Sequence, residues 1–134
     1  VMADQLKNMN YGNGDVGTPE DITLYWLVGP LGITAKQQVA FLERYIEGEL
    51  DLSEDTYKAS KPVMLMNEAP RYALYGKTGW RSVSGDPDLG WFVGWLDVRD
   101  DIYVFAFNLD MTEPDMASLR TELVLEALTE IGAL

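Results

Sequence analysis

Apolar residues recur at helical spacing in the first third of the chain, and the clearest such stretch lies between Thr34 and Gly48. Thr34 and Gln37 have the spacing of a capping box, which typically opens a helix. The residues that would form the apolar stripe of this helix are Val39, Leu42 and Ile46, with Phe41 and Tyr45 beside them. We therefore expect a helix after Thr34 that ends at Gly48.

Three further stretches predict helices. Residues 1–10 have the spacing of the last turns of a helix that begins elsewhere. Ser53 can cap another helix, and we expect Pro62 to break or kink it and a short turn to follow through Met66. The spacing of the last stretch predicts a helix over residues 118–131. Its expected inward residues are Leu119, Leu123, Ala127, Leu128 and Ile131.

Between these helical stretches the pattern predicts an antiparallel meander of three strands. The expected strands are residues 71–77, 90–98 and 102–109. A long polar connection over residues 78–89 joins the first two, and a tight turn at residues 99–101 joins the last two. The two later strands are apolar on both faces, so the sheet must be covered on both sides.

The third strand, residues 102–109, leaves a structural deficit. One of its edges pairs with the strand before it, and the other would be a long hydrophobic open edge. Either the chain forms a homodimer there or a segment outside this sequence supplies a neighbouring strand. Residues 11–19 predict a loop, and the short apolar piece at residues 25–30 predicts a buried loop anchor.

Composition narrows the chemistry mainly by exclusion. The chain has no cysteine and no histidine, which excludes disulfides, thiolate catalysis, Ser-His-Asp triads and Cys- or His-ligated metal sites. The acidic residues show no metal-binding spacing, and Asp86, Asp88, Asp100 and Asp101 are expected to be solvated in turns. We expect no metal and no cofactor. The net charge of −12 argues against nucleic acid and anionic membranes as partners.

No apolar run approaches the eighteen or so residues of a membrane span, and no signal-peptide pattern opens the chain.

The candidate chemistry lies at Lys77, Thr78 and Gly79, where a predicted strand ends. There a cation and a hydroxyl stand beside a glycine that allows a ligand to approach the backbone, which suits an anionic substrate with a carbonyl group. The alternative is a plain surface strand end with a turn glycine.

Five segments stand in the order and with the spacing seen in class D serine β-lactamases, so the chain resembles the C-terminal half of such an enzyme's catalytic domain. They are Tyr11-Gly12-Asn13, Tyr25-Trp26-Leu27-Val28-Gly29-Pro30-Leu31 with Ile33-Thr34, Lys77-Thr78-Gly79-Trp80, Gly90-Trp91-Phe92-Val93-Gly94-Trp95, and Leu119-Arg120. The resemblance implies that residues 1–134 form part of a single β-lactamase/transpeptidase-like domain. Its fold class is α/β (α+β), an antiparallel sheet covered by helices on both faces.

The resemblance also implies roles for particular residues. Lys77 would be the cation of the family's third motif, and Thr78 would hydrogen-bond the substrate carboxylate next to Gly79. The backbone amide of Trp80 would be one of two oxyanion donors. Arg120 would be the principal anchor of the substrate carboxylate.

Two parts of the family pattern concern the first third of the chain. Trp26 matches the tryptophan that packs against the family's general base, a carboxylated lysine, although it could equally be a plain core residue. Tyr11, Gly12 and Asn13 match the middle motif, whose role is mainly architectural.

The family's Ser-x-x-Lys motif, which holds the nucleophile, is absent from this chain. The chain alone should therefore not turn over a β-lactam and would need its own N-terminal half.

The resemblance thus implies that the chain is the C-terminal portion of a class D β-lactamase. Such an enzyme hydrolyses penicillins through a serine acyl-enzyme and would be periplasmic or secreted in a bacterium. Three alternatives stay open. The first is the penicillin-binding sensor domain of a β-lactam-responsive receptor, which stays acylated. The second is a cell-wall transpeptidase relative, and the third is a non-catalytic fragment that associates with itself.

Overall fold

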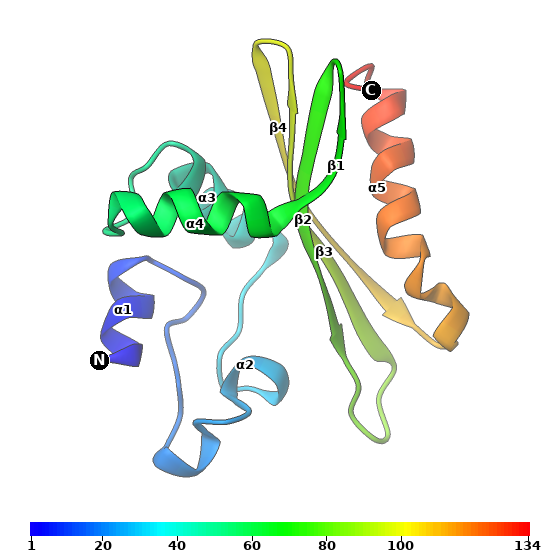
Figure 1. Cartoon of the computed structure of the whole chain (residues 1–134). Coiled ribbons are helices and arrows are strands. Elements are labelled where there is room, and N and C mark those ends of the chain that lie inside the picture. Colours follow the sequence, from blue (N-terminus) through cyan, green and yellow to red (C-terminus); the bar gives the residue numbers. More distant parts are fainter. The chain divides into compact units, whose positions relative to one another are not determined.

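The computed structural model describes all residues from 1 to 134, and the chain divides into two compact units (Figure 1). The first unit is Val1–Leu52 and the second is Ser53–Leu134. The first is helical, with α1 at Met2–Asn8, a 3₁₀ turn at Pro19–Asp21, α2 at Tyr25–Val28 and α3 at Ala35–Ile46. The second contains the sheet.

The predicted capping box at the start of α3 is confirmed. The Thr34 hydroxyl accepts a hydrogen bond from the Gln37 backbone N–H at 3.2 Å, and the Gln37 side-chain oxygen accepts one from the Thr34 N–H at 2.9 Å. These bonds satisfy two donors that a helix start leaves unpaired. At the other end, Gly48 has φ +73°, a conformation in which glycine avoids the clash that a Cβ would cause. The helix ends there as expected.

The second unit is an antiparallel sheet in the order β1-β2-β3-β4, with one helix before it and one after it (Figure 1). The elements are α4 at Glu54–Met64, β1 at Leu65–Ala69, β2 at Tyr72–Arg81, β3 at Asp88–Val98, β4 at Asp101–Met111, a 3₁₀ turn at Pro114–Ala117 and α5 at Leu119–Glu130. Each strand pairs with the next along the chain, so the meander is confirmed, with one strand more than expected.

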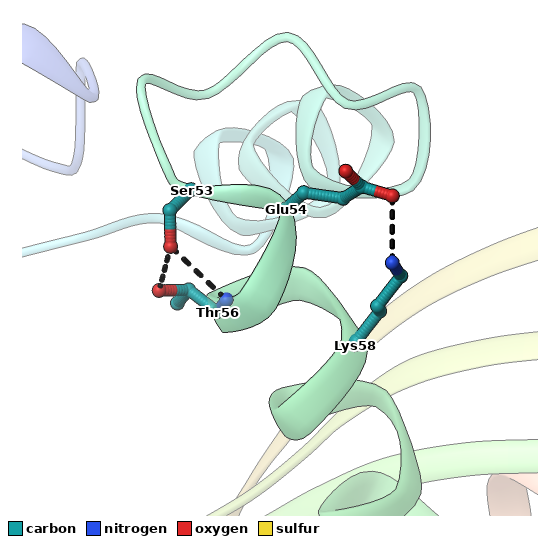
Figure 2. A network of polar contacts seen from close by, with 4 residues as sticks. All are labelled: Ser53, Glu54, Thr56 and Lys58. Atoms are coloured by element: carbon teal, nitrogen blue, oxygen red, sulfur yellow. Dashed lines mark hydrogen bonds and ion pairs between the residues drawn. The ribbon is translucent and has the colours of Figure 1, made fainter.

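Helix α4 begins at the predicted cap (Figure 2). The Ser53 hydroxyl accepts a hydrogen bond from the Thr56 N–H at 3.2 Å and lies 2.8 Å from the Thr56 hydroxyl. One turn further on, the Lys58 ammonium contacts the Glu54 carboxylate at 2.7 Å. Such an exposed i,i+4 pair contributes only about 0.5 kcal/mol, so the cap is the stronger of the two signals.

Of the expected break or kink at Pro62 and the turn through Met66, the break and the turn do not occur. Helix α4 continues to Met64, so Pro62 lies in its last turn, and the residues that follow form β1. β1 pairs with the start of β2, from Leu65 opposite Tyr75 to Ala69 opposite Tyr72. Its sequence has few β-branched residues, so the pairing with β2 rather than local preference makes it a strand.

The strands β2 and β3 are also longer than the sequence indicated. Their ladder continues to Arg81 opposite Leu89, and only residues 82–87 remain as a loop. Glycine and polar residues obscure the strand pattern in this stretch, but the neighbouring strand supplies hydrogen-bond partners for it. The extension matters because the whole Lys-Thr-Gly triplet becomes part of a strand.

The core of the second unit lies between one face of the sheet and α5. The buried residues of this cluster are Leu74, Phe92, Leu96, Val124, Leu128 and Ala133. The expected inward stripe of α5 was right for Leu128, which is buried, but wrong for Leu123 and Ile131, which are 38% and 65% exposed. The buried stripe runs through Arg120, Val124 and Leu128. A charged residue at its first position hides this phase from a purely hydrophobic pattern.

Helix α4 lies against the opposite face of the sheet (Figure 1). Its Lys61 ammonium lies 4.9 Å from the centre of the Tyr75 ring, which stacks on Trp95. The sheet therefore has helices on both faces, as predicted. Strand β4 is the outer strand of the sheet, which confirms that the third predicted strand lies at an edge.

Candidate active site

The predicted strand end Lys77-Thr78-Gly79-Trp80 lies in the second half of β2, where the sheet is open on one side. β1 pairs with β2 only as far as Tyr75, whereas β3 pairs with β2 along its whole length. Residues 76–81 therefore have a strand neighbour on one edge only. Backbone amides and carbonyls on the other edge are left for a ligand or another chain.

Alternation along β2 places the residues of this segment on two faces. Thr78 and Trp80 share the face of Leu74, on which α5 packs, and Lys77 and Gly79 lie on the other. The Lys77 side chain is exposed, and its ammonium donates to the backbone carbonyl of Thr78 at 2.5 Å. The cation is thus held along the strand by a backbone carbonyl, on the face opposite the Thr78 side chain.

Arg120 reaches this segment from the first turn of α5. It is only 9% exposed. Its Nη1 donates to the carbonyl of Gly79, and its Nε donates to the carbonyl of Ala117 at 2.8 Å. Arg120 takes part in none of the ion pairs of the chain. These two bonds use two of a guanidinium's five N–H donors, so it can still bind an anion.

A glycine makes room for this arginine. A Cβ at Gly90 would lie 2.5 Å from Arg120 Cδ and 2.8 Å from Met111 Sδ. The aliphatic part of the arginine therefore crosses β3 directly over Gly90. The sequence places Gly90 in a family-like segment, but its role was missed. The only signal was a glycine inside a strongly apolar strand, which often marks a close approach.

Trp80 connects the arginine to a carboxylate. The Arg120 guanidinium lies 5.5 Å from the centre of the Trp80 ring, and the indole Nε1 donates to Asp88 Oδ2 at 2.6 Å. Hydrogen bonds from Ser82 and Trp80, together with the nearby charge of Arg81, hold the pKa of Asp88 below its ordinary value. The prediction that Asp88 lies in a turn was wrong. It is the first residue of β3.

The predicted middle motif forms a separate cluster in the first unit. The Asn13 side chain donates to the carbonyl of Pro30 at 2.9 Å and accepts from the N–H of Gly32 at 3.2 Å. Gly12 has φ +56°, and a Cβ there would clash with the backbone oxygen of Gly32. The Tyr11 ring packs edge-on against Phe41, with ring centres 4.8 Å apart, and burial raises the pKa of Tyr11. These contacts fit the expected architectural role.

Trp26 lies in the first unit as well, and its surroundings differ from the expected buried loop anchor. Residues 25–28 form the short helix α2, and the Trp26 side chain is 59% exposed. Its ring contacts Tyr25 edge-on at 5.2 Å. In α3, the side-chain oxygen of Gln38 is buried without a hydrogen-bond partner. The second unit thus gathers Lys77, Thr78, Gly79, Trp80 and Arg120, and the first holds the other four predicted residues.

A cavity of about 720 Å³ lies at the other end of the sheet, lined in part by Tyr72, Tyr103 and Leu125. None of the predicted site residues lines it. The chain contains no group of three or more acidic, histidine or cysteine residues that could hold a metal ion. Among its helices, none has the length and apolar character needed to cross a membrane.

Comparisons with known proteins identify the family of the chain. The family of penicillin-binding protein transpeptidase domains matches residues 1–129. β-Lactamase OXA-48 of Klebsiella pneumoniae is 33% identical over 96% of this chain and 48% of its own length. The regulatory protein BlaR1 of Bacillus licheniformis is 31% identical over 95% of this chain and 21% of its own.

Solved structures show the same relationship. The class D β-lactamase YbXI from Nostoc superposes with a TM-score of 0.94 and 42% identity, covering 98% of this chain and 54% of that one. FUS-1 (OXA-85) from Fusobacterium nucleatum superposes with a TM-score of 0.89 and 35% identity, over 97% and 53%. The chain spans about half the length of these class D enzymes.

Proposed function

Because this chain belongs to the penicillin-binding protein transpeptidase domain family and resembles its class D β-lactamases, we propose that it supplies the substrate-binding portion of a serine β-lactamase site. One observation carries this proposal. Arg120 is buried without a carboxylate partner and is tied to the carbonyl of Gly79 in the Lys-Thr-Gly strand. A desolvated guanidinium with spare donors is a binding site for a carboxylate such as that of a penicillin.

The neighbouring groups suit the same ligand. The Lys77 ammonium adds a second positive charge beside the strand, and the Thr78 hydroxyl can hydrogen-bond a carboxylate oxygen. Screening limits the repulsion by the net charge of −12, because the Debye length is about 10 Å at 0.1 M salt. The two nearby cations can therefore dominate the local field.

The acyl-transfer step would use the open edge of β2. A serine attacks the β-lactam carbonyl, the ring amide opens, and water then releases the acyl group. The developing oxyanion needs N–H donors, and the Trp80 amide lies in the segment of β2 that has a strand on one edge only. We infer that Trp80 supplies one of the two donors. Lys77 would hold a hydroxyl of the partner half.

The nucleophile must come from elsewhere, because the chain has no Ser-x-x-Lys. We propose that an N-terminal half, in the same parent protein or as a separate chain, supplies it. The outer edge of β4 offers backbone groups for a strand of that half, and Ile102 on β4 is 48% exposed. A periplasmic or secreted location would follow from this function.

A second function is favoured by one specific observation, the match to the regulatory protein BlaR1. In that case the assembled domain would be a penicillin sensor whose acyl-enzyme persists. The two functions share the same carboxylate site and differ in the rate of deacylation. An acyl adduct that lasts for hours would favour the sensor, and one that clears in seconds would favour the enzyme.

Intact-mass spectrometry tests the proposal first. The chain is co-expressed with the Ser-x-x-Lys half of a class D relative and mixed with a penicillin. We expect the partner polypeptide to gain the mass of the drug only when this chain is present. A partner that is acylated equally without this chain would contradict the proposal.

The role of Arg120 is tested in the same reconstituted enzyme. Arg120→Ala should raise KM for a carboxylate-bearing penicillin about tenfold or more, because the principal anchor is lost. Arg71→Ala removes an exposed arginine from the turn between β1 and β2 and serves as the matched control. An Arg120→Ala enzyme with the KM of the Arg71→Ala enzyme would remove Arg120 from the site.

A further inference from the structure

Three residues from three elements form a chain of contacts that ends at the proposed carboxylate anchor, Arg120. Asp88 begins β3 and accepts the hydrogen bond from the Trp80 indole at 2.6 Å. Trp80, near the end of β2, places its ring centre 5.5 Å from the Arg120 guanidinium. Asp88 therefore reaches the arginine through the tryptophan, and no family-like segment of the sequence contains it.

The strand register explains why these side chains meet. Trp80 pairs directly with Gly90, and Asp88 lies two residues before Gly90, so it stands on the same face as a diagonal neighbour of Trp80. Gly90 itself has no side chain, and the aliphatic part of Arg120 lies over it. The three side chains thus share one face of the sheet around a single glycine.

The contacts also show what holds each group. The Trp80 side chain is 44% exposed, and its one recorded hydrogen bond is the one to Asp88. Arg120 is held by two backbone carbonyls, that of Ala117 on Nε and that of Gly79 on Nη1. The ring of Trp80 lies beside Cζ of the guanidinium. Without Asp88, the indole would lose the partner that selects its rotamer.

We propose that Asp88 is a positioning residue for the carboxylate anchor. By holding the Trp80 indole with a charged acceptor, it keeps the ring against the guanidinium that the two backbone carbonyls orient, and so helps to hold the free donors in place for a carboxylate. This proposal rests on the proposed role of Arg120. It concerns how tightly a carboxylate-bearing β-lactam binds and leaves the acyl-transfer groups untouched.

The first test uses the 134-residue chain and its four tryptophan indole N–H signals in ¹⁵N-correlated NMR spectra. Trp80→Phe identifies the Trp80 signal. We expect Asp88→Leu to move that signal away from its hydrogen-bonded position and Asp88→Asn to move it less, since an amide oxygen still accepts. Asp86→Leu is the control, because Asp86 lies two residues before Asp88, in the loop that leads into β3, and contacts Arg81 instead, at 3.6 Å. A Trp80 signal that stays in place in Asp88→Leu would overturn the proposal.

The second test uses the reconstituted enzyme and a carboxylate-bearing penicillin. Asp88→Leu should raise KM about three- to tenfold and leave kcat within about twofold, because binding is affected and chemistry is not. Asp88→Asn should recover most of the lost affinity, and Asp86→Leu should behave like the unsubstituted enzyme. A general loss of folding would instead lower the active fraction without moving KM.

The outcomes separate this proposal from the one it rests on. An unchanged KM in Arg120→Ala overturns the anchor and this proposal together. A raised KM in Arg120→Ala with an unchanged KM in Asp88→Leu overturns only the positioning role of Asp88. A raised KM in both, with the Trp80 signal displaced in Asp88→Leu, supports it.

Discussion

The two halves of β2 belong to one strand but differ in their strand neighbours. The first half, residues 72–75, has β1 on one side and β3 on the other, and its Leu74 is 4% exposed in the core. The second half, residues 76–81, keeps β3 as its neighbour but lacks β1. The first half holds the sheet together, and the second presents its cation, its hydroxyl and its backbone edge.

The difference shows that the proposed binding groups are placed by a strand and not by a loop. A strand anchored at one end by pairing on both sides holds its free end in a defined geometry. Two glycines differ in the same way, because a Cβ at Gly94 would meet the backbone of Tyr75 and Gly76, where the two halves join, whereas a Cβ at Gly79 would meet only Trp91 Cβ, at 3.4 Å. Matched substitutions in the two halves can therefore separate stability from binding.

The largest expected effect comes from adding one methyl group near the paired half. Gly94→Ala would place a Cβ 2.1 Å from the Tyr75 oxygen and 2.7 Å from Gly76 Cα, both in the backbone of β2. Because backbone atoms cannot rotate away, we expect a loss of about 3 kcal/mol or more in unfolding free energy. Gly79→Ala is the matched control, with its nearest contact at 3.4 Å, and should cost less than about 1 kcal/mol. Urea unfolding measures both, and equal losses would break the comparison.

A somewhat smaller effect is expected from truncating side chains on the α5 face. Leu74→Ala removes a core side chain and should cost about 2–4 kcal/mol of unfolding free energy. Thr78→Ala, four residues further along the same face, should cost less than about 1 kcal/mol, since Thr78 is only half-buried. The same denaturant series checks both. A Thr78→Ala loss as large as that of Leu74→Ala would mean that the second half carries the core as well.

Lys77 should matter for activity and hardly at all for folding. Lys77→Met removes an exposed ammonium, so unfolding free energy should change by no more than about 0.5 kcal/mol. In the reconstituted enzyme, kcat/KM for a penicillin should fall about a hundredfold, because a positive group aimed at developing charge is lost. Lys58→Met, which removes an exposed cation from α4, is the control. Equal activity in the two variants would show that Lys77 is a surface residue.

The smallest expected effect is a dependence of the unfolding free energy on pH, caused by the Asp88 carboxylate at the start of β3. The pKa of Asp88 is lowered by hydrogen bonds from Ser82 and Trp80 and by the charge of Arg81. A lowered pKa in the folded state means that the ionised carboxylate stabilises the fold above about pH 4 and that this contribution is lost as pH falls through the folded-state value. Wild type should therefore be more stable than Asp88→Asn at pH 7. The difference should shrink as the pH falls below about 4 and through the folded-state pKa, and a gap that stays constant as the protein is acidified would contradict the assignment.

Much of the fold could be read from the sequence because local signals coincide with the final structure. The capping box at Thr34 and the cap at Ser53 act within one turn of helix, so no distant residue is needed to predict them. The same holds for the apolar runs of β3 and β4. What failed was β1, which exists because β2 lies beside it.

The sequence by itself determined which chemical groups this protein can use: a lysine, a threonine and an arginine in a family-like order, with no nucleophile motif, histidine or cysteine. Only the tertiary structure decided that Arg120 is buried, that Gly90 makes room for it, and that Asp88 reaches it through Trp80. The physical reason is distance along the chain. These contacts join residues on β2, β3 and α5, and they arise only when strand register and helix packing are set together.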